Sequence, residues 1–152
     1  MRVKCLLFIL MVAACDKLPE PPSPIAQPKS KKPDLELQEQ CAKQAREEFK
    51  QAGWDKDWAG FTNHYNEKLN RCFMLVEITD ASKSTLGMIW RYKTLTDAFE
   101  GKTIGLFVWH TEKGKKYWEV PPFQCELTPP AGERVFCKSE EEFDEFVKTY
   151  ME

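Results

Sequence analysis

Apolar residues recur with the period of an α-helix at both ends of residues 34–152. Over residues 34–52 they fall on one stripe at spacings of three and four, and Gly53 follows as a helix stop. Near the C-terminus, Ser139 and Glu142 match the capping box that opens a helix. The two stripes are Leu37, Cys41, Ala45, Phe49 and Ala52, then Phe143, Phe146, Val147 and Tyr150. The pattern predicts one amphipathic helix at each end.

Between these helices the pattern changes to that of β-strands. The clear strand segments are residues 69–79, 86–92 and 104–110. The first contains an unbroken apolar run over 72–76, which indicates burial on both faces of a sheet. Weaker strand segments follow, and Pro121 and Pro122 restrict them to an edge because proline cannot donate a ladder hydrogen bond. These weaker segments are residues 117–120, 123–127 and 134–137.

The order of these elements predicts an α+β fold. Residues 54–68 contain Gly60 and two asparagines, and we expect them to form a long ordered loop before the first strand. An antiparallel meander of about four to five strands would follow, with both terminal helices packed on the sheet. Residues 34–152 number 119, a length that suits one globular domain.

The N-terminus has the pattern of a secretion signal. Arg2 and Lys4 precede ten uncharged, apolar residues over 5–14, too few for a membrane-spanning helix, which needs ~20. The run ends in Val12-Ala13-Ala14-Cys15, which resembles the lipobox of bacterial lipoproteins. The resemblance covers residues 1–15 alone. It implies that the signal peptide 1–14 is removed, that Cys15 is lipidated, and that the chain is anchored to a membrane of the cell envelope, facing the periplasm or the cell exterior.

Residues 15–33 separate this anchor from the globular domain. Six of the ten prolines lie here, with few apolar residues and no periodicity. Such a segment buries too little apolar surface to offset the entropy lost on ordering. At ~3.1 Å per residue in an extended polyproline conformation, residues 16–33 would reach about 55 Å. We expect a disordered tether rich in proline and lysine.

Charge excludes one class of partner for the globular domain. Residues 34–152 contain sixteen Lys or Arg against twenty-two Asp or Glu, a net charge of −6. Nucleic-acid affinity depends on neutralising phosphates with basic residues. We therefore expect no nucleic-acid partner.

Four cysteines remain in the domain once Cys5 leaves with the signal and Cys15 carries the lipid. An even count in an exported protein predicts two disulfides, with three possible connectivities. We favour Cys41–Cys72, joining the first helix to the buried strand, and Cys125–Cys137, closing a loop before the last helix. The cysteines form no Cys-x-x-Cys pair, and neither histidine stands at ligand spacing from one. No metal or other cofactor is expected.

The domain has no recognisable catalytic motif. Gly101-Lys102-Thr103 resembles the end of a phosphate-binding loop, but position 96 is threonine where that loop requires glycine. No nucleophile-elbow, zinc-protease or dinucleotide-binding motif occurs, and we predict no catalytic residue. His64, within Asn63-His64-Tyr65-Asn66, has two interpretations. It fastens the predicted loop to the core, which we favour, or it belongs to a binding site.

Five tryptophans are the remaining signal for function. Trp90 and Trp109 fall at core-like strand positions and are expected to pack, whereas His110 is expected at the surface. Trp54, Trp58 and Trp118 lie in or near predicted loops, where exposed indoles could stack on sugars.

Three classes of function follow from this pattern. The favoured class is a lipid-anchored, non-catalytic binding domain for an envelope protein, including an inhibitor or immunity type of role. The alternative is a glycan- or peptidoglycan-binding module that uses the loop tryptophans. An enzyme is the least favoured class.

Overall fold

The structure of the chain is a computed structural model that describes residues 32–152, apart from 55–57, 82–86 and 130–131. The expected signal peptide, Cys15 and the tether up to residue 31 lie outside the described residues. The last two residues of the expected tether, 32 and 33, are described and belong to the first helix, which begins at Lys32. The prediction of a disordered tether is wrong for these two residues. Among the described helices, none is long and apolar enough to cross a membrane.

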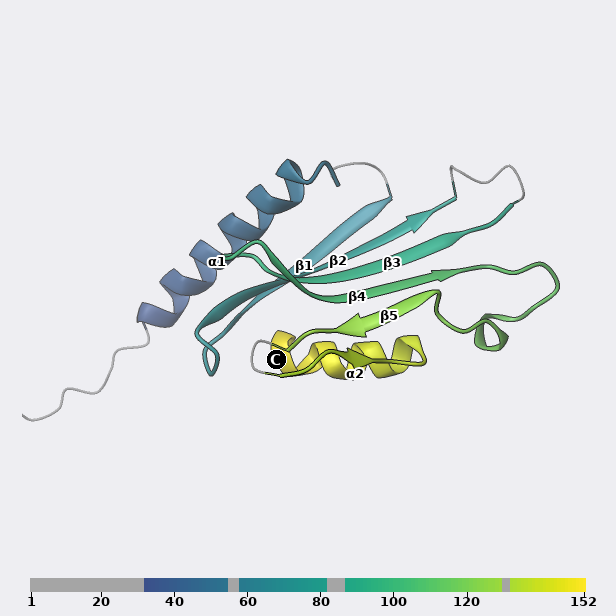
Figure 1. Cartoon of the computed structure of the whole chain (residues 1–152). Coiled ribbons are helices and arrows are strands. Elements are labelled where there is room, and N and C mark those ends of the chain that lie inside the picture. The colour runs from purple at the N-terminus through teal and green to yellow at the C-terminus, as the bar shows by residue number, and fades with distance from the viewer. Residues whose placement is uncertain (1–31, 55–57, 82–86, 130–131) are drawn as a thin grey trace, which may run out of the picture.

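The described chain forms one six-stranded antiparallel sheet and two helices (Figure 1). The strands lie side by side in chain order, so every connection joins neighbours. The elements are α1 (Lys32–Gln51), β1 (Ala59–Asn66), β2 (Arg71–Asp80), β3 (Trp90–Asp97), β4 (Lys102–His110), a 3₁₀ turn η1 (Tyr117–Glu119), β5 (Gln124–Leu127), β6 (Val135–Phe136) and α2 (Glu140–Met151). The predicted α+β meander with terminal helices is confirmed, with six strands instead of four to five.

The prediction of a long loop over residues 54–68 is wrong, because β1 occupies most of that segment. Gly60 and the asparagines have low strand propensity, which hid the strand. Tertiary contacts override that propensity: all eight residues pair with β2, and Phe61 and Tyr65 pack in the core beneath α1. Strand propensity chiefly reflects such packing, so a half-buried strand can form from a weak sequence.

Two smaller predictions also differ from the structure. The strand expected at 117–120 is instead the 3₁₀ turn η1, where the Glu119 carboxylate accepts a hydrogen bond from the Lys116 backbone N–H at 2.7 Å. The strand expected at 86–92 begins only at Trp90 and continues to Asp97. The edge position expected for β5 is taken by β6, a strand of two residues.

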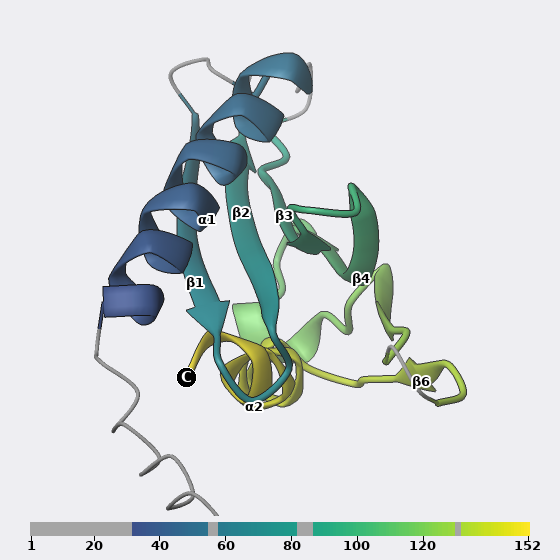
Figure 2. The same cartoon turned by 90° about the vertical axis from the view of Figure 1, so that its left-hand side faces the viewer.

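The two helices pack on opposite faces of the sheet. Alternate residues of β2 divide between two cores: Cys72, Met74 and Val76 pack under α1, whereas Phe73 packs under α2. We call these faces the α1 face and the α2 face. Helix α1 packs against β1 and β2, as Figure 2 shows, while α2 contacts β1, β4 and β5. The larger core lies on the α2 face and includes Phe107 and Phe143, both fully buried.

Both predicted disulfides are present. Cys41–Cys72 joins α1 to β2 with 5.3 Å between the Cα atoms. Cys125–Cys137 joins β5 to the segment before α2 with 5.1 Å between the Cα atoms. Each bond therefore fastens one helix, or the approach to it, to the sheet.

Helix α2 is fixed at both of its ends. The Ser139 hydroxyl accepts a hydrogen bond from the Glu142 N–H at 3.2 Å, which confirms the predicted N-cap. The Glu142 carboxylate accepts from the Lys138 N–H at 2.8 Å. At the other end, the Asn66 side-chain amide donates to the carbonyl of Tyr150 at 3.2 Å. These contacts fix the first turn of α2 and join its C-terminal end to the end of β1.

Candidate binding surfaces

A buried ion network joins α2 to the centre of the sheet. The Glu140 carboxylate, in the first turn of α2, accepts hydrogen bonds from Arg91 at 2.7 and 2.8 Å, and from the Tyr117 hydroxyl. Lys93 Nζ lies 2.7 Å from Glu140 and 2.7 Å from Asp144. Both Glu140 and Lys93 are buried. Each buried charge thus has an opposite charge within hydrogen-bonding distance.

This network shifts the pKa of its members. Burial would raise the pKa of Glu140, but hydrogen bonds from Lys93 and Tyr117 and the charges of Lys93 and Arg91 outweigh it and lower that pKa. Burial would lower the pKa of Lys93, but Asp144 and Glu140 outweigh it and raise that pKa. Burial, followed by the hydrogen bond to Glu140, raises the pKa of Tyr117. Such paired, strongly held charges suit a structural role.

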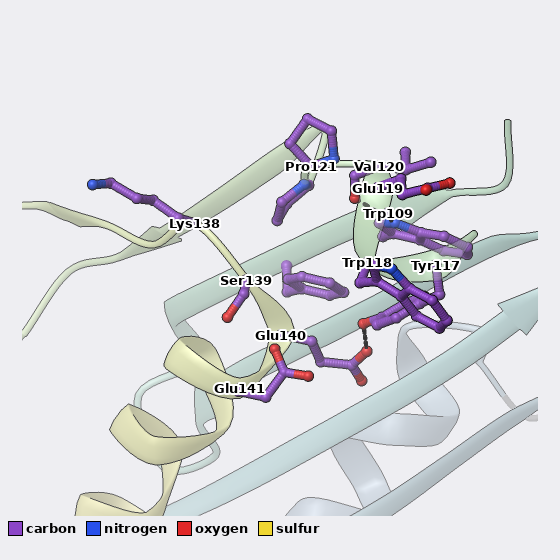
Figure 3. A pocket seen from close by; sticks show the side chains of 12 residues that line it. Trp109, Tyr117, Trp118, Glu119, Val120, Pro121, Lys138, Ser139, Glu140 and Glu141 are labelled. Carbon is purple, nitrogen blue, oxygen red and sulfur yellow. Dashed lines mark hydrogen bonds between the residues drawn. The ribbon is translucent and has the colours of Figure 1, made fainter. Parts of the chain in front are cut away.

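A shallow cleft of about 240 Å³ lies beside this network, between η1 and the N-terminus of α2 (Figure 3). Trp118 stands at its rim and is 75% exposed, with Lys116 Nζ 5.1 Å from the centre of its ring. The cleft is lined by Phe107, Trp109, Tyr117, Trp118, Glu119, Val120, Pro121, Pro122, Lys138, Ser139, Glu140 and Glu141. Trp109 is buried as predicted, and its indole N–H donates to the Val120 carbonyl at 3.0 Å.

A second surface lies on the α1 face, beyond the part that α1 covers. Within the described ranges α1 packs against β1 and β2, and no helix packs over β3, β4 and β5 on that face. Register places on this open half the side chains that alternate with the buried ones of the α2 face. Half-buried or exposed among them are Trp90, Tyr92, Leu106, His110, Gln124, Glu126 and Phe136, whereas Val108 is buried.

Four aromatic rings gather at one end of this open half, and we call them the aromatic patch: Trp90, Tyr92, His110 and Phe123. Trp90 stacks on Tyr92 with 6.1 Å between ring centres and 14° between planes. Its ring also lies 4.7 Å from His110 and 6.1 Å from Phe123. Phe123 is 70% exposed, and the other three are half-buried. The patch is thus an ordered aromatic cluster that remains accessible.

The three tryptophans on which the alternative of a glycan-binding module rests do not form a common platform. Trp54 is half-buried and packs against Phe49 of α1, with 6.3 Å between ring centres, so it belongs to the core. Trp58 is 61% exposed and lies directly before β1. Trp118 is exposed in η1, beside the N-terminus of α2. A groove of parallel indoles, which would favour a glycan, is therefore not formed by these residues.

His64 lies on the edge strand β1, half-buried, on the α2 face. Among the described residues its side chain makes no hydrogen bond, whereas its neighbours do. The Tyr65 hydroxyl donates to Asn70, and Asn66 both caps α2 and accepts from the Leu69 N–H at 3.0 Å. The hydrogen bonds that fasten this segment therefore come from Asn63, Tyr65 and Asn66, and not from His64 as expected.

The core position predicted for Trp90 differs from the structure, which places this half-buried ring in the aromatic patch. Its signal was present in the sequence, since Trp90 and Tyr92 alternate on one strand and His110 has the same parity on the next. The sequence does not show which strands α1 covers, and that placement decides whether the side chains of β3 and β4 on this face are buried.

Within the described part of the chain, no group of three or more histidine, cysteine or acidic side chains could hold a metal ion. Comparison with known proteins found no matching family model, no similar curated protein and no similar solved structure.

Proposed function

We propose that this protein is a lipid-anchored, non-catalytic interaction domain that binds a protein of the cell envelope through the open half of its α1 face. The observation that carries the proposal is the aromatic patch on the part of the α1 face that neither described helix covers. Anchoring through Cys15 follows from the lipobox resemblance, and it would hold the domain at a membrane surface.

The composition of the open half suits a protein interface. Tryptophan and tyrosine are enriched at interface hot spots, because they bury a large area while losing little side-chain entropy. Here the rings of Trp90 and Tyr92 already support one another, so little ordering remains to be done on binding. Phe123 and Phe136, exposed by 70% and 71%, extend the apolar area toward β6.

Charge indicates the kind of partner. The globular region 34–152 carries −6, which steers association toward a basic surface. A small, disulfide-bonded domain with a rigid aromatic surface is compatible with an inhibitor or immunity type of role. The proposed partner is therefore an envelope protein with a basic surface around an apolar centre.

Site-specific photocrosslinking in living cells tests this proposal. The full chain carrying a photoreactive residue at Phe123 or Phe136 should crosslink to the same envelope protein. A matched chain with the probe at Lys43, exposed on α1, should not. Trp90→Ala should reduce the crosslink from Phe136, whereas Trp58→Ala, at an exposed tryptophan before β1, should leave it unchanged. Equal crosslinking from Lys43 and Phe123 would contradict the proposal.

A glycan ligand is the second candidate, supported by Trp118 alone. This exposed indole stands beside a cleft lined by Lys138, Ser139 and Glu141, whose polar groups could bond sugar hydroxyls. If the chain binds cell-wall glycan there, Trp118→Ala should abolish sedimentation of the full chain with purified peptidoglycan. Trp58→Ala should not change it. No sedimentation of the wild-type chain would remove this candidate.

A further inference from the structure

The outer edge of β1 leaves a row of backbone groups without partners among the described residues. The Thr79 N–H donates to the Trp58 carbonyl, and the Ala98 N–H donates to the Cys72 carbonyl. Odd-numbered residues of β2 therefore bond to β1, and their register partners are the even-numbered residues of β1. In β1 it is therefore the odd-numbered residues whose backbone N–H and C=O groups point away from the sheet. These are Ala59, Phe61, Asn63 and Tyr65.

Strand β1 itself carries none of the sequence features that prevent strand pairing. Exposed edges are normally blunted by charged side chains, proline, a bulge or very short length, or are covered by a helix or loop, whereas α1 and α2 contact β1 on its two faces. Strand β1 has eight residues, no charged residue, no proline and an unbroken register with β2. The opposite edge of the sheet is β6, which is blunted by its length of two residues. The two edges therefore differ in their capacity to accept another strand.

We propose that β1 pairs with β1 of a second copy of this chain, forming a dimer with a continuous twelve-stranded antiparallel sheet. The sequence of β1 is self-complementary about Thr62. A two-fold axis there pairs Phe61 with Asn63 of the second copy and Ala59 with Tyr65, so every outward N–H and C=O of these residues gains a partner.

Side-chain sizes agree with the same register. On the α1 face, Tyr65 lies opposite the small Ala59 of the second copy. On the α2 face, His64 lies opposite Gly60, where no atom lies within 4 Å of the position a Cβ would take. Thr62, which is exposed, meets itself on the axis, and Thr–Thr pairs are favourable across strands. No like charges face each other, since the strand has none.

The dimer goes beyond the proposed function and does not depend on it. Strand β1 lies at the edge of the sheet, and β2 separates it from the aromatic patch on β3 and β4 (Figure 2). A second copy at this edge would leave both open halves free, and it would present two binding surfaces from one assembly.

Cysteine crosslinking of the full chain in its membrane tests the register. Residues on the axis form a non-hydrogen-bonded pair with Cα atoms about 4.5 Å apart, within the range of a disulfide. Thr62→Cys should therefore give a disulfide-linked species of twice the chain mass on non-reducing gels. Lys68→Cys, exposed in the turn after β1, should stay at the mass of one chain.

Sedimentation of the detergent-solubilised full chain tests the dimer without a crosslink. Thr62→Lys should weaken the dimer at least about tenfold, because two like charges would face each other on the axis. Asn63→Pro removes an outward N–H and no backbone bond to β2, and should likewise give monomers. It also removes the contact of the Asn63 amide with Cys41 Sγ at 3.8 Å, so Asn63→Ala, which keeps the backbone N–H, is the matched control and should remain a dimer. Trp90→Ala should sediment as wild type.

Two results would overturn the dimer. One is a wild-type chain that sediments as a monomer at all concentrations and gives no crosslink from Thr62→Cys. The other is a Thr62→Cys crosslink to a different envelope protein, which would assign this edge to a foreign strand.

Discussion

The two faces of the sheet place polar and apolar residues in opposite ways. On the α2 face, Lys93 and Glu140 are buried charges, held by each other and by Arg91, Asp144 and Tyr117. On the open half of the α1 face, aromatic rings remain accessible although burial would stabilise them. Charged side chains are usually excluded from cores, and clusters of large aromatic rings are unusual on surfaces. Both arrangements therefore require a specific reason.

The comparison separates what holds the fold from what is available to a partner. A buried ion network adds little net stability over apolar packing, but a shift of α2 that breaks its pairs would leave a buried charge with a partner missing. The aromatic patch has no such internal role, since the core under α1 is complete without it. We therefore expect substitutions on the α2 face to change stability, and those on the open half to change binding.

Removing the carboxylate of Glu140 should have the largest effect. Glu140→Ala leaves Lys93 buried with a partner missing, which typically costs about 3–5 kcal/mol of unfolding free energy. Glu141→Ala, at the exposed neighbouring position, is the matched control and should stay within about 0.5 kcal/mol. Urea denaturation of both variants measures the difference. Equal losses would show that the network does not hold α2.

The two disulfides should contribute unequally. Cys41–Cys72 spans 31 residues and Cys125–Cys137 spans 12, so chain-entropy arguments give about 4 and about 3 kcal/mol respectively. Replacing each pair by alanine and measuring urea denaturation tests this order. A larger loss from the shorter loop would mean that packing around Cys125, and not loop closure, dominates.

A methyl group added at Gly105 should be poorly tolerated on the α2 face. A Cβ there would lie 2.7 Å from Leu127 and 3.2 Å from Phe143, both fully buried. Overpacking of this kind costs about 1–3 kcal/mol. Gly132→Ala is the control, because the nearest atom would lie at an ordinary 3.5 Å. Thermal melts that rank the two variants equally would contradict the tight packing of α2.

The ion network should make stability depend on pH at both extremes. The pKa of Glu140 is lowered in the folded chain, so its contribution is present above about pH 4.3, the pKa of an unfolded glutamate, and is lost as the pH falls further. The pKa of Lys93 is raised, so its contribution is present below about pH 10.4 and is lost at higher pH. Glu140→Gln should flatten the acid limb of a urea-denaturation series. An unchanged limb would assign acid sensitivity to other carboxylates.

The open half should give the smallest effect on stability. Phe123→Ser removes a ring that is 70% exposed, and the unfolding free energy should change by no more than about 0.5 kcal/mol. Phe143→Ser on the α2 face is the comparison, and it should lose several kcal/mol because Phe143 is fully buried. A large loss from Phe123→Ser would mean that the aromatic patch belongs to the core.

Local patterns predicted those elements whose signal is contained in a few neighbouring residues. The helical stripes, the Ser139 cap, the apolar run of β2 and both disulfide pairings agree with the structure. Strand β1 was missed because its stability comes from pairing with β2 and packing under α1, not from its own propensity. The Glu140 network was missed for a similar reason, because Arg91 and Glu140 are 49 residues apart in sequence.

The alternation of Trp90 and Tyr92, the charge of residues 34–152 and the lipobox on which the proposed anchor rests can all be read from the sequence. Which of these side chains are covered depends on the tertiary structure. The period of two shows which side chains share a face of a strand. Whether that face is buried depends on where a helix that is distant in sequence packs. Because α1 covers β1 and β2 and stops there, the rings of β3 and β4 became a surface instead of a core.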